Sequence, residues 1–271
     1  MDRNAPIGIF DSGLGGLTAL KAVRESFPNE DLVYFGDTLR VPYGNRSKET
    51  IIEYVKDDIN VLLHYGVKVI VVACNTADST ARNEVSGDYD IPVIGVVEPA
   101  VKKAVETTEN KNIGVICTVA TAASHAYEKA IGKLDADCNV IIEPTPLIVP
   151  LIEEGRIHKG DKVLNRVLNE YLLPLAEKGI DTLVLGCTHY PIIADNIAEI
   201  LPGIALINSG SAAVEELSKV LSENDLFADR KEKGTVRYFV SDIPDSFAST
   251  ASHFIEEDIA GKVEKVEFDK I

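Results

Sequence analysis

The stretch Val67-Lys-Val-Ile-Val-Val-Ala-Cys-Asn-Thr76 carries the pattern on which the fold prediction rests. A β-branched apolar run of strand length ends in a small residue, and a cysteine and short polar side chains follow it. The stretch Asp181-Thr-Leu-Val-Leu-Gly-Cys-Thr188 has the same order of residue types. We hypothesise that the two form a pseudo-repeat, with Cys74 and Cys187 in matching places of two α/β domains.

Apolar runs of this kind recur along the chain and alternate with longer amphipathic stretches, such as residues 17–27 and 49–65. The alternation predicts βαβ units, and therefore an α/β fold of mostly parallel sheets flanked by helices. Ligands bind such sheets at the carboxyl ends of the strands, so the residues after each run are candidate site residues. The runs expected to form strands are residues 7–10, 32–35, 67–73, 93–97, 113–116, 140–142, 183–185 and 204–207.

The composition of the 271 residues is that of a globular protein with a sizeable core, since 45% are hydrophobic and 26% are charged. A net charge of -16 argues against nucleic acid or an anionic membrane surface as a partner, because both are bound largely through clustered Lys and Arg. No apolar run approaches the roughly 20 residues of a membrane helix. Four cysteines in a chain of this length, and no signal peptide, predict a cytoplasmic protein with free thiols.

Cys74 and Cys187 are the candidate catalytic pair. A single cysteine after a buried strand is usually only a small apolar residue, and Cys117 has no symmetric mate. Two cysteines in equivalent places, each followed by hydroxyl or amide side chains, suit a reaction that needs a base on one face of a carbon and an acid on the other. His189 could stabilise the thiolate of Cys187, and Asp11 could play the corresponding part for Cys74.

Other chemistries have weaker support in the sequence. Thiolate and imidazole bind zinc, so a metal-dependent hydrolase stays open, but no C-x-x-C pair or H-E-x-x-H helix accompanies the cysteines and His189. The glycine loop 11–18 and Asp37 resemble a dinucleotide-binding motif, yet Thr18 stands in the place of its third glycine. We therefore expect no metal and no cofactor.

Six segments occur in order along the chain: Phe10-Asp-Ser-Gly-Leu-Gly-Gly-Leu17, Tyr34-Phe-Gly-Asp-Thr-Leu-Arg-Val-Pro-Tyr-Gly44, Val72-Ala-Cys-Asn-Thr-Ala77, Pro92-Val-Ile-Gly-Val-Val-Glu-Pro99, Val149-Pro-Leu-Ile-Glu-Glu-Gly155 and Leu185-Gly-Cys-Thr-His-Tyr-Pro191. Together they closely resemble glutamate racemases, the cofactor-independent enzymes that supply D-glutamate for bacterial peptidoglycan. The resemblance runs from about Gly8 to Gly210. Among the positions that depart from the family pattern is Asp78, which stands where a small residue is usual.

The resemblance implies an isomerase that racemises glutamate by two-base proton transfer at Cα. Cys74 matches the base for the D enantiomer, and Cys187 matches the base for the L enantiomer. Asp11, Glu153 and His189 match the supporting acids and imidazole. The residues that match positions binding the substrate's amino and carboxylate groups are Asp11, Ser12, Pro42, Tyr43, Gly44, Asn75, Thr76, Thr118, Thr121, Thr188 and His189.

The resemblance also implies a homodimer and two similar domains with the site between them. We expect residues 1–97 plus 208–271 to form the first domain and residues 98–207 the second, with a crossing near Glu98-Pro99. The nearest rival is aspartate racemase, which shares the two thiols; the sequence His189-Tyr-Pro191 favours glutamate. A binding protein or cell-division regulator that keeps the fold without turnover is the rival from another class.

Overall fold

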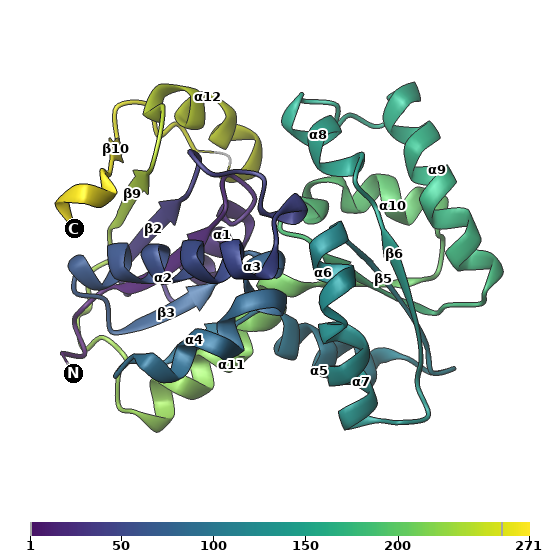
Figure 1. The fold of residues 1–271 in the computed structure, drawn as a ribbon, viewed down its shortest axis with the longest axis horizontal. Coiled ribbons are helices and arrows are strands. Elements are labelled where there is room, and N and C mark those ends of the chain that lie inside the picture. Colours follow the sequence, from purple (N-terminus) through teal and green to yellow (C-terminus); the bar gives the residue numbers. More distant parts are fainter. Residues whose placement is uncertain (1, 256) are drawn as a thin grey trace.

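The computed structural model describes residues 2–255 and 257–271. They form two parallel β-sheets flanked by helices, one in each half of the molecule, so the predicted α/β class is confirmed (Figure 1). The first sheet has six strands in the order β10-β9-β2-β1-β3-β4, and the second has four in the order β6-β5-β7-β8. The strands are β1 (Ile7–Asp11), β2 (Leu32–Gly36), β3 (Val69–Val72), β4 (Val93–Gly95), β5 (Asn112–Cys117), β6 (Asn139–Pro144), β7 (Thr182–Gly186), β8 (Ala205–Asn208), β9 (Val236–Val240) and β10 (Val263–Lys265).

Four consecutive strands have the same spatial order in each sheet. The order β2-β1-β3-β4 in the first sheet corresponds to β6-β5-β7-β8 in the second. Cys74 lies just past β3, and Cys187 lies just past β7, which is the third strand of each set. The hypothesis of a pseudo-repeat with the two cysteines in matching places is therefore confirmed.

The strand register also gives Cys117 a counterpart, which the sequence patterns had not revealed. Phe10 in β1 pairs with Val72 in β3, so Asp11 lies beside the residue that precedes Cys74. Cys117 in β5 pairs with Gly186, the residue that precedes Cys187. Asp11 and Cys117 are therefore equivalent, since they end β1 and β5, which come first along the chain in each set of four strands.

The amphipathic stretches expected at residues 17–27 and 49–65 form helices over residues 17–26 and 48–64. A strand was expected over residues 93–97, but β4 ends at Gly95 and α5 begins at Val97. Pro99 explains the shift, because the first turn of a helix does not need the N–H that proline lacks. The helices are α1 (Leu17–Ser26), α2 (Lys48–His64), α3 (Asn75–Ala77), α4 (Asn83–Val85), α5 (Val97–Thr107), α6 (Val119–Ser124), α7 (Ala126–Leu134), α8 (Ile148–Glu153), α9 (Lys162–Glu177), α10 (Ala194–Ile200), α11 (Ser209–Glu223) and α12 (Pro244–Ile255), with short 3-10 turns at η1 (Tyr43–Asn45), η3 (Ser86–Asp88), η4 (Tyr190–Ile193) and η5 (Phe268–Lys270), and a π-helical turn η2 (Asp78–Arg82).

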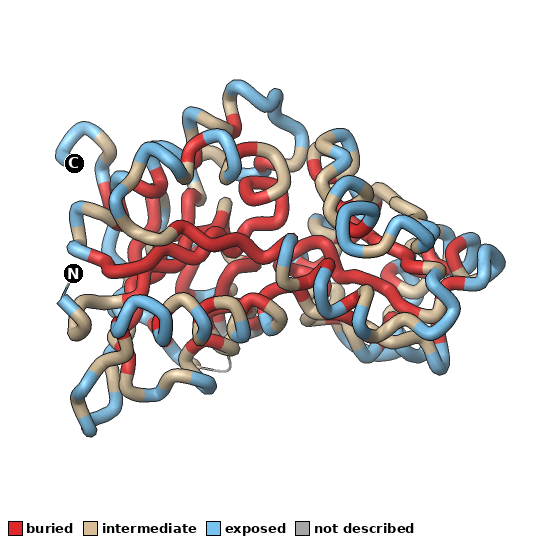
Figure 2. The backbone as a smooth tube through the Cα atoms, turned by 90° about the horizontal axis from the view of Figure 1, so that it is seen from below, coloured by how far each residue is buried: buried red, intermediate tan, exposed pale blue. Residues whose placement is uncertain are grey.

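The C-terminal part of the chain returns to the first sheet. Strand β9 pairs with β2, and β10 pairs with β9, so both ends of the chain lie in the same half of the molecule (Figure 1). Both sheets form a buried layer that runs through the two halves, with helices covering their faces (Figure 2). Because all the pairs are parallel, the carboxyl ends of β1 and β3 meet at one edge, as do those of β5 and β7.

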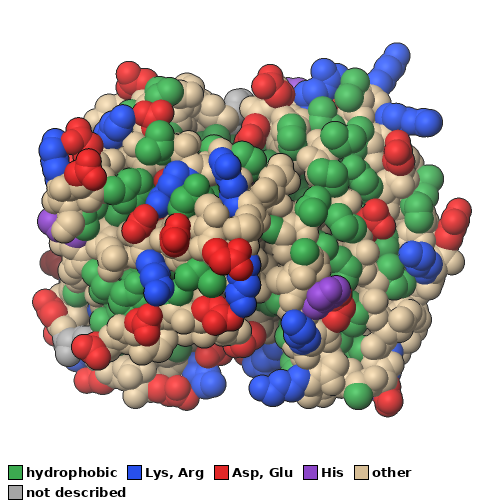
Figure 3. All heavy atoms as spheres, viewed as in Figure 1, with side chains coloured by type: hydrophobic (Ala, Val, Ile, Leu, Met, Phe, Trp, Pro, Cys, Tyr) green, Lys and Arg blue, Asp and Glu red, His purple; other side chains and the backbone are tan. Residues whose placement is uncertain are grey.

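Charged side chains of both signs cover the face of the molecule that Figure 3 shows. Lys and Arg are interspersed with Asp and Glu there, over both halves. Within the described residues, no helix is long and apolar enough to cross a bilayer.

A buried ion pair between Lys68 and Glu30 holds four chain segments together at the amino end of β3. The ammonium of Lys68 also donates to the carbonyl oxygen of Arg3 at 2.6 Å. The carboxylate of Glu30 also accepts from the backbone N–H of Ala228 at 2.8 Å. Every charge in this cluster therefore has a partner, as burial requires.

We predict that Glu30→Ala lowers the free energy of unfolding by about 3–5 kcal/mol, because it leaves the ammonium of Lys68 buried without its partner. Chemical denaturation monitored by circular dichroism measures this. The matched control is Glu84→Ala, which removes a carboxylate from an exposed pair with Lys48 and should leave the free energy of unfolding close to the wild-type value, because exposed ion pairs contribute little. Equal losses in the two variants would contradict the prediction.

Candidate active site

The two cysteines lie at the facing edges of the two sheets, and both are nearly buried. Their exposed fractions are 5% for Cys74 and 6% for Cys187. Burial raises the pKa of the Cys74 thiol, and the charges of Asp11 and Cys187 raise it further. The two sulfur atoms thus lie near enough to influence each other, and Cys74 holds its proton at neutral pH.

Cys187 lies beside a histidine that can keep its thiolate charged. Its Sγ is 3.8 Å from Nδ1 of His189, and Nε2 of His189 is 3.1 Å from a carboxylate oxygen of Glu153, the last residue of α8. Burial alone would lower the pKa of His189, but the bonds to Cys187 and Glu153 outweigh it and raise the pKa to about 10. The imidazole is therefore a cation at neutral pH, and a cation is the partner that stabilises a thiolate.

Asp11 connects the loops of the two sheets at this point. The carboxylate is fully buried and accepts from the backbone N–H of Gly13 at 2.9 Å. It also accepts from the hydroxyl of Thr188, which follows Cys187, at 3.3 Å. Ser12, the next residue, places its Oγ 3.6 Å from Sγ of Cys74. The expectation that Asp11 stabilises the thiolate of Cys74 is wrong, because the charge of Asp11 raises the pKa of that thiol and favours its protonated form.

Three threonine hydroxyls from the two halves form a cluster. Oγ1 of Thr76 is 2.9 Å from Oγ1 of Thr118, which lies 3.0 Å from Oγ1 of Thr121. Thr118 also caps α6, since its hydroxyl accepts from the backbone N–H of Thr121. A Cβ at Gly44 would lie 3.0 Å from Thr118, so the backbone of the 42–44 loop approaches the cluster closely. The threonine hydroxyls expected to bind the substrate therefore lie together, beside the backbone of the 42–44 loop.

The side chain of Tyr43 points away from this cluster. Its phenol is buried between the carboxylates of Asp37 and Asp58, and its oxygen lies 2.9 Å from Oδ2 of Asp58. Asp58 also accepts from Arg40, and Asp37 from Ser241, both in bonds of normal length. The backbone is therefore the part of Tyr43 that can contact a ligand.

Asp37 is also part of this network. Together with the glycine loop 11–18, it had resembled the ribose-binding acid of a dinucleotide-binding motif. Its carboxylate is buried and takes its hydrogen bonds from Tyr43, Arg40 and Ser241. Asp37 and Asp58 were not among the predicted site residues. Asp37 belongs to the 34–44 segment that resembles the family, but Asp58 gave no signal, because a single acid on an amphipathic helix reads as a solvated face.

The side chain of Asn75 bonds to two other helices. Its amide N–H donates to the hydroxyl of Tyr127 in α7 at 2.9 Å, and its amide oxygen accepts from Ser209 at the start of α11 at 3.2 Å. Asn75 thus joins the helix that follows Cys74 to two helices of other parts of the chain.

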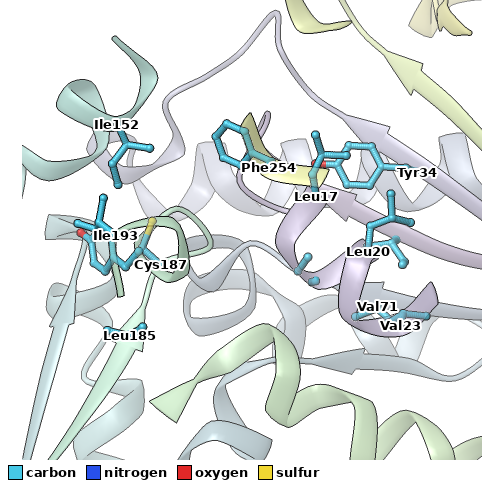
Figure 4. Close-up of a cluster of buried hydrophobic side chains, with 14 of the residues drawn as sticks. Leu17, Leu20, Val23, Tyr34, Val71, Ile152, Leu185, Cys187, Ile193 and Phe254 are labelled. Carbon is cyan, nitrogen blue, oxygen red and sulfur yellow. The ribbon is translucent and has the colours of Figure 1, made fainter. Parts of the chain in front are cut away.

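Apolar side chains surround Cys187 and His189 on the remaining sides. Ile152 and Ile193 lie near Cys187 in the second half, and Phe254 of α12 faces them from the first (Figure 4). The ring of Phe254 packs edge-on against His189, with 5.6 Å between centroids. This wall excludes water from the thiolate and imidazolium, which strengthens their interaction. The role of Phe254 had no signal in the sequence, since α12 follows no motif.

Within the part of the chain whose side chains the structure describes, no group of three or more His, Cys, Asp or Glu is arranged to hold a metal ion. All four cysteines are free thiols.

The chain is similar to known racemases over nearly its whole length. A family model for Asp/Glu/Hydantoin racemase matches residues 19–217. The glutamate racemase of Persephonella marina is 45% identical over 98% of each chain. The crystal structure of glutamate racemase from Francisella tularensis, in complex with D-glutamate, is 38% identical with a TM-score of 0.91 over 99% of this chain and 100% of that one. Glutamate racemase isoform RacE1 of Bacillus anthracis is 34% identical with a TM-score of 0.93 over 98% of each chain. The chain therefore belongs to the Asp/Glu/Hydantoin racemase family.

Proposed function

We propose that this protein is a glutamate racemase, which interconverts L- and D-glutamate without a cofactor and supplies D-glutamate for peptidoglycan. The observation that carries the proposal is the pair of buried thiols at equivalent strand ends of two facing sheets, one beside a cationic imidazole and the other protonated. Such a pair holds one base and one acid before the substrate arrives. The relatives named glutamate racemase support the choice of glutamate.

In the direction from L to D, the thiolate of Cys187 removes the proton from Cα. The C–H bond breaks, an S–H bond forms, and the electron pair stays on Cα and delocalises into the carboxylate. The thiol of Cys74 then gives its proton to the opposite face of the planar carbon. After this step Cys187 is a thiol and Cys74 a thiolate, which is the form that acts on D-glutamate in the reverse direction. Exchange of protons with solvent returns the two sulfur atoms to their starting state.

Binding must also make the Cα proton of the substrate more acidic, because a thiolate with a pKa near 8.5 is a poor base for the α-proton of an amino acid. We infer that the cluster of Thr76, Thr118 and Thr121 and the backbone near Gly44 donate to the substrate carboxylate, where negative charge grows in the transition state. The carboxylate of Asp11 suits the substrate ammonium, and Ser12 and Thr188 flank the two thiols.

Three further expectations belong to the same proposal. The domain boundaries are residues 1–97 plus 208–271 and residues 98–207, the site lies between the domains, and the chain works as a homodimer in the cytoplasm. Sedimentation equilibrium of the purified protein measures the oligomeric state, and a monomer at all concentrations would contradict the dimer.

Pro42 follows a cis bond from Val41 and starts the loop that we assign to the substrate carboxylate.

The proposal is tested by incubating the purified protein in D₂O with each enantiomer of glutamate and of aspartate. Racemisation of glutamate should proceed with deuterium entering Cα of the product, since each proton comes from a thiol that exchanges with solvent. Turnover of aspartate alone would assign the rival substrate. No exchange with either amino acid would leave a binding role.

We predict that Cys74→Ser and Cys187→Ser each lower kcat for glutamate racemisation by at least about 10³-fold, because a hydroxyl is too weak an acid and base for either step. Each variant keeps one thiol. Cys74→Ser should therefore still eliminate chloride from L-β-chloroglutamate, and Cys187→Ser from the D enantiomer. Release of chloride and of the α-keto acid measures this.

The matched control is Cys138→Ser, which changes a thiol in the turn before β6. It should leave both reactions at the wild-type rate. Full racemase activity in Cys74→Ser or Cys187→Ser would overturn the two-thiol assignment.

We predict that His189→Gln slows the alkylation of Cys187 by iodoacetamide at neutral pH and leaves that of Cys74 unchanged. The pKa of His189 is raised from 6.5 to about 10, so its cation stabilises the thiolate fully below the lower value and is lost as the pH rises through the higher one. The difference between wild type and variant should shrink as the pH approaches 10. Mass spectrometry of each alkylated cysteine measures the rates, and a difference that grows with pH would refute the role.

A further inference from the structure

Asp78 is a buried carboxylate on the helical segment that follows Cys74. Its backbone N–H donates to the carbonyl oxygen of Cys74 at 2.9 Å, so the two residues lie one turn apart. Asp78 starts η2, the π-helical turn between α3 and α4, and π turns within helices occur frequently at functional sites. Its side chain is 1% exposed. No step of the mechanism above uses it.

The carboxylate of Asp78 caps a helix to which it does not belong. One of its oxygens accepts from the backbone N–H groups of Val96 and Val97, both at 2.7 Å. Val97 is the first residue of α5, and this helix has no side-chain cap of its own. A carboxylate at a helix N-terminus satisfies free N–H groups and interacts favourably with the helix dipole.

The remaining neighbours fix the carboxylate in place. Its other oxygen accepts from Nε of Arg82 at 2.5 Å, and Nη2 of Arg82 is 3.3 Å from the carboxylate of Glu98. Gly95, just before the cap, leaves no room for a side chain, because a Cβ there would lie 2.1 Å from the Asp78 carboxylate. Asp78, Arg82, Gly95 and the start of α5 therefore form one unit joined by hydrogen bonds and close contact.

Helix α5 leads from this unit to the other thiol. It follows β4, the last strand of the first sheet before the chain enters the second, and it packs against β7. Cys187 directly follows β7. A continuous path of hydrogen bonds and packing thus runs from Cys74 through Asp78 and α5 to Cys187.

We propose that Asp78 is a positioning residue that fixes the separation of the two thiols across the substrate. The inference rests on the proposed racemase function, and it adds a residue that touches neither substrate nor sulfur. Racemisation needs both thiols within reach of the same carbon, whereas elimination of a β-chloride needs only one. Loosening the contact between Asp78 and α5 should therefore slow racemisation more than elimination.

The test compares the two reactions in Asp78→Ala. The ratio of elimination from each β-chloroglutamate enantiomer to racemisation of glutamate should rise about tenfold over wild type, since small misplacements of reacting groups cost one to two orders of magnitude. Asp78→Asn keeps an oxygen that can accept from Val96 and Val97, and should restore the ratio in part. Gly95→Ala disturbs the same contact from the other side and should raise the ratio.

The matched control is Asp181→Ala. Asp181 also accepts from two successive backbone N–H groups at 2.7 Å, those of Glu109 and Asn110, but it lies beyond the opposite end of α5. The substitution removes a carboxylate with comparable backbone hydrogen bonds and should leave the ratio at the wild-type value.

Each outcome decides the proposal. A raised ratio in Asp78→Ala and Gly95→Ala, with Asp181→Ala unchanged, supports it. An unchanged ratio, including equal loss of both reactions, would overturn it, because a merely structural residue affects the two reactions alike. Failure of the racemase proposal is a separate result, since it appears as a lack of glutamate turnover in the wild-type protein.

Discussion

The site depends on the burial of two thiols whose surroundings differ in charge. Burial disfavours a thiolate, so a pair of buried cysteines would by itself hold both protons. Burial raises the pKa of the Cys74 thiol and the charge of Asp11 raises it further, whereas Cys187 lies beside the His189 cation, which Glu153 holds. The apolar side chains around the sulfur atoms strengthen each of these interactions, because little water screens them.

Much of this arrangement could be predicted from the sequence. The strands that carry the cysteines have strong β-branched patterns, and short polar motifs directly after them form the hydroxyl cluster and the contact from Asp11 to Thr188. The local sequence determines that each of these residues follows a strand, and the parallel order of the strands brings their carboxyl ends together. Strands β9 and β10 were not predicted. β10 has only three residues, two of them charged, and β9 has a charged residue at its second position.

The features that could not be predicted are all tertiary. Asp58 on α2 looks like one more acid of a solvated helix face until the fold brings Arg40 and Tyr43 over it. Phe254 reaches His189 only because the C-terminal segment returns to the first half. Tyr43 and Asn75 were correctly placed near the site, but the direction of their side chains depends on partners far away in the sequence.

The shared strand order of the two sheets bears on how such an enzyme could arise. Duplication of one half-length ancestor would place two identical strand ends face to face, with equal thiols on either side of a bound amino acid. A symmetric ancestor of this kind would treat both enantiomers alike, yet neither thiol would be prepared as acid or base. At the first strand of each set the copies now differ, with a carboxylate at Asp11 and a thiol at Cys117. The two equivalent strand ends therefore differ in charge: the Asp11 carboxylate raises the pKa of the Cys74 thiol, whereas burial raises the pKa of Cys117 and keeps it neutral.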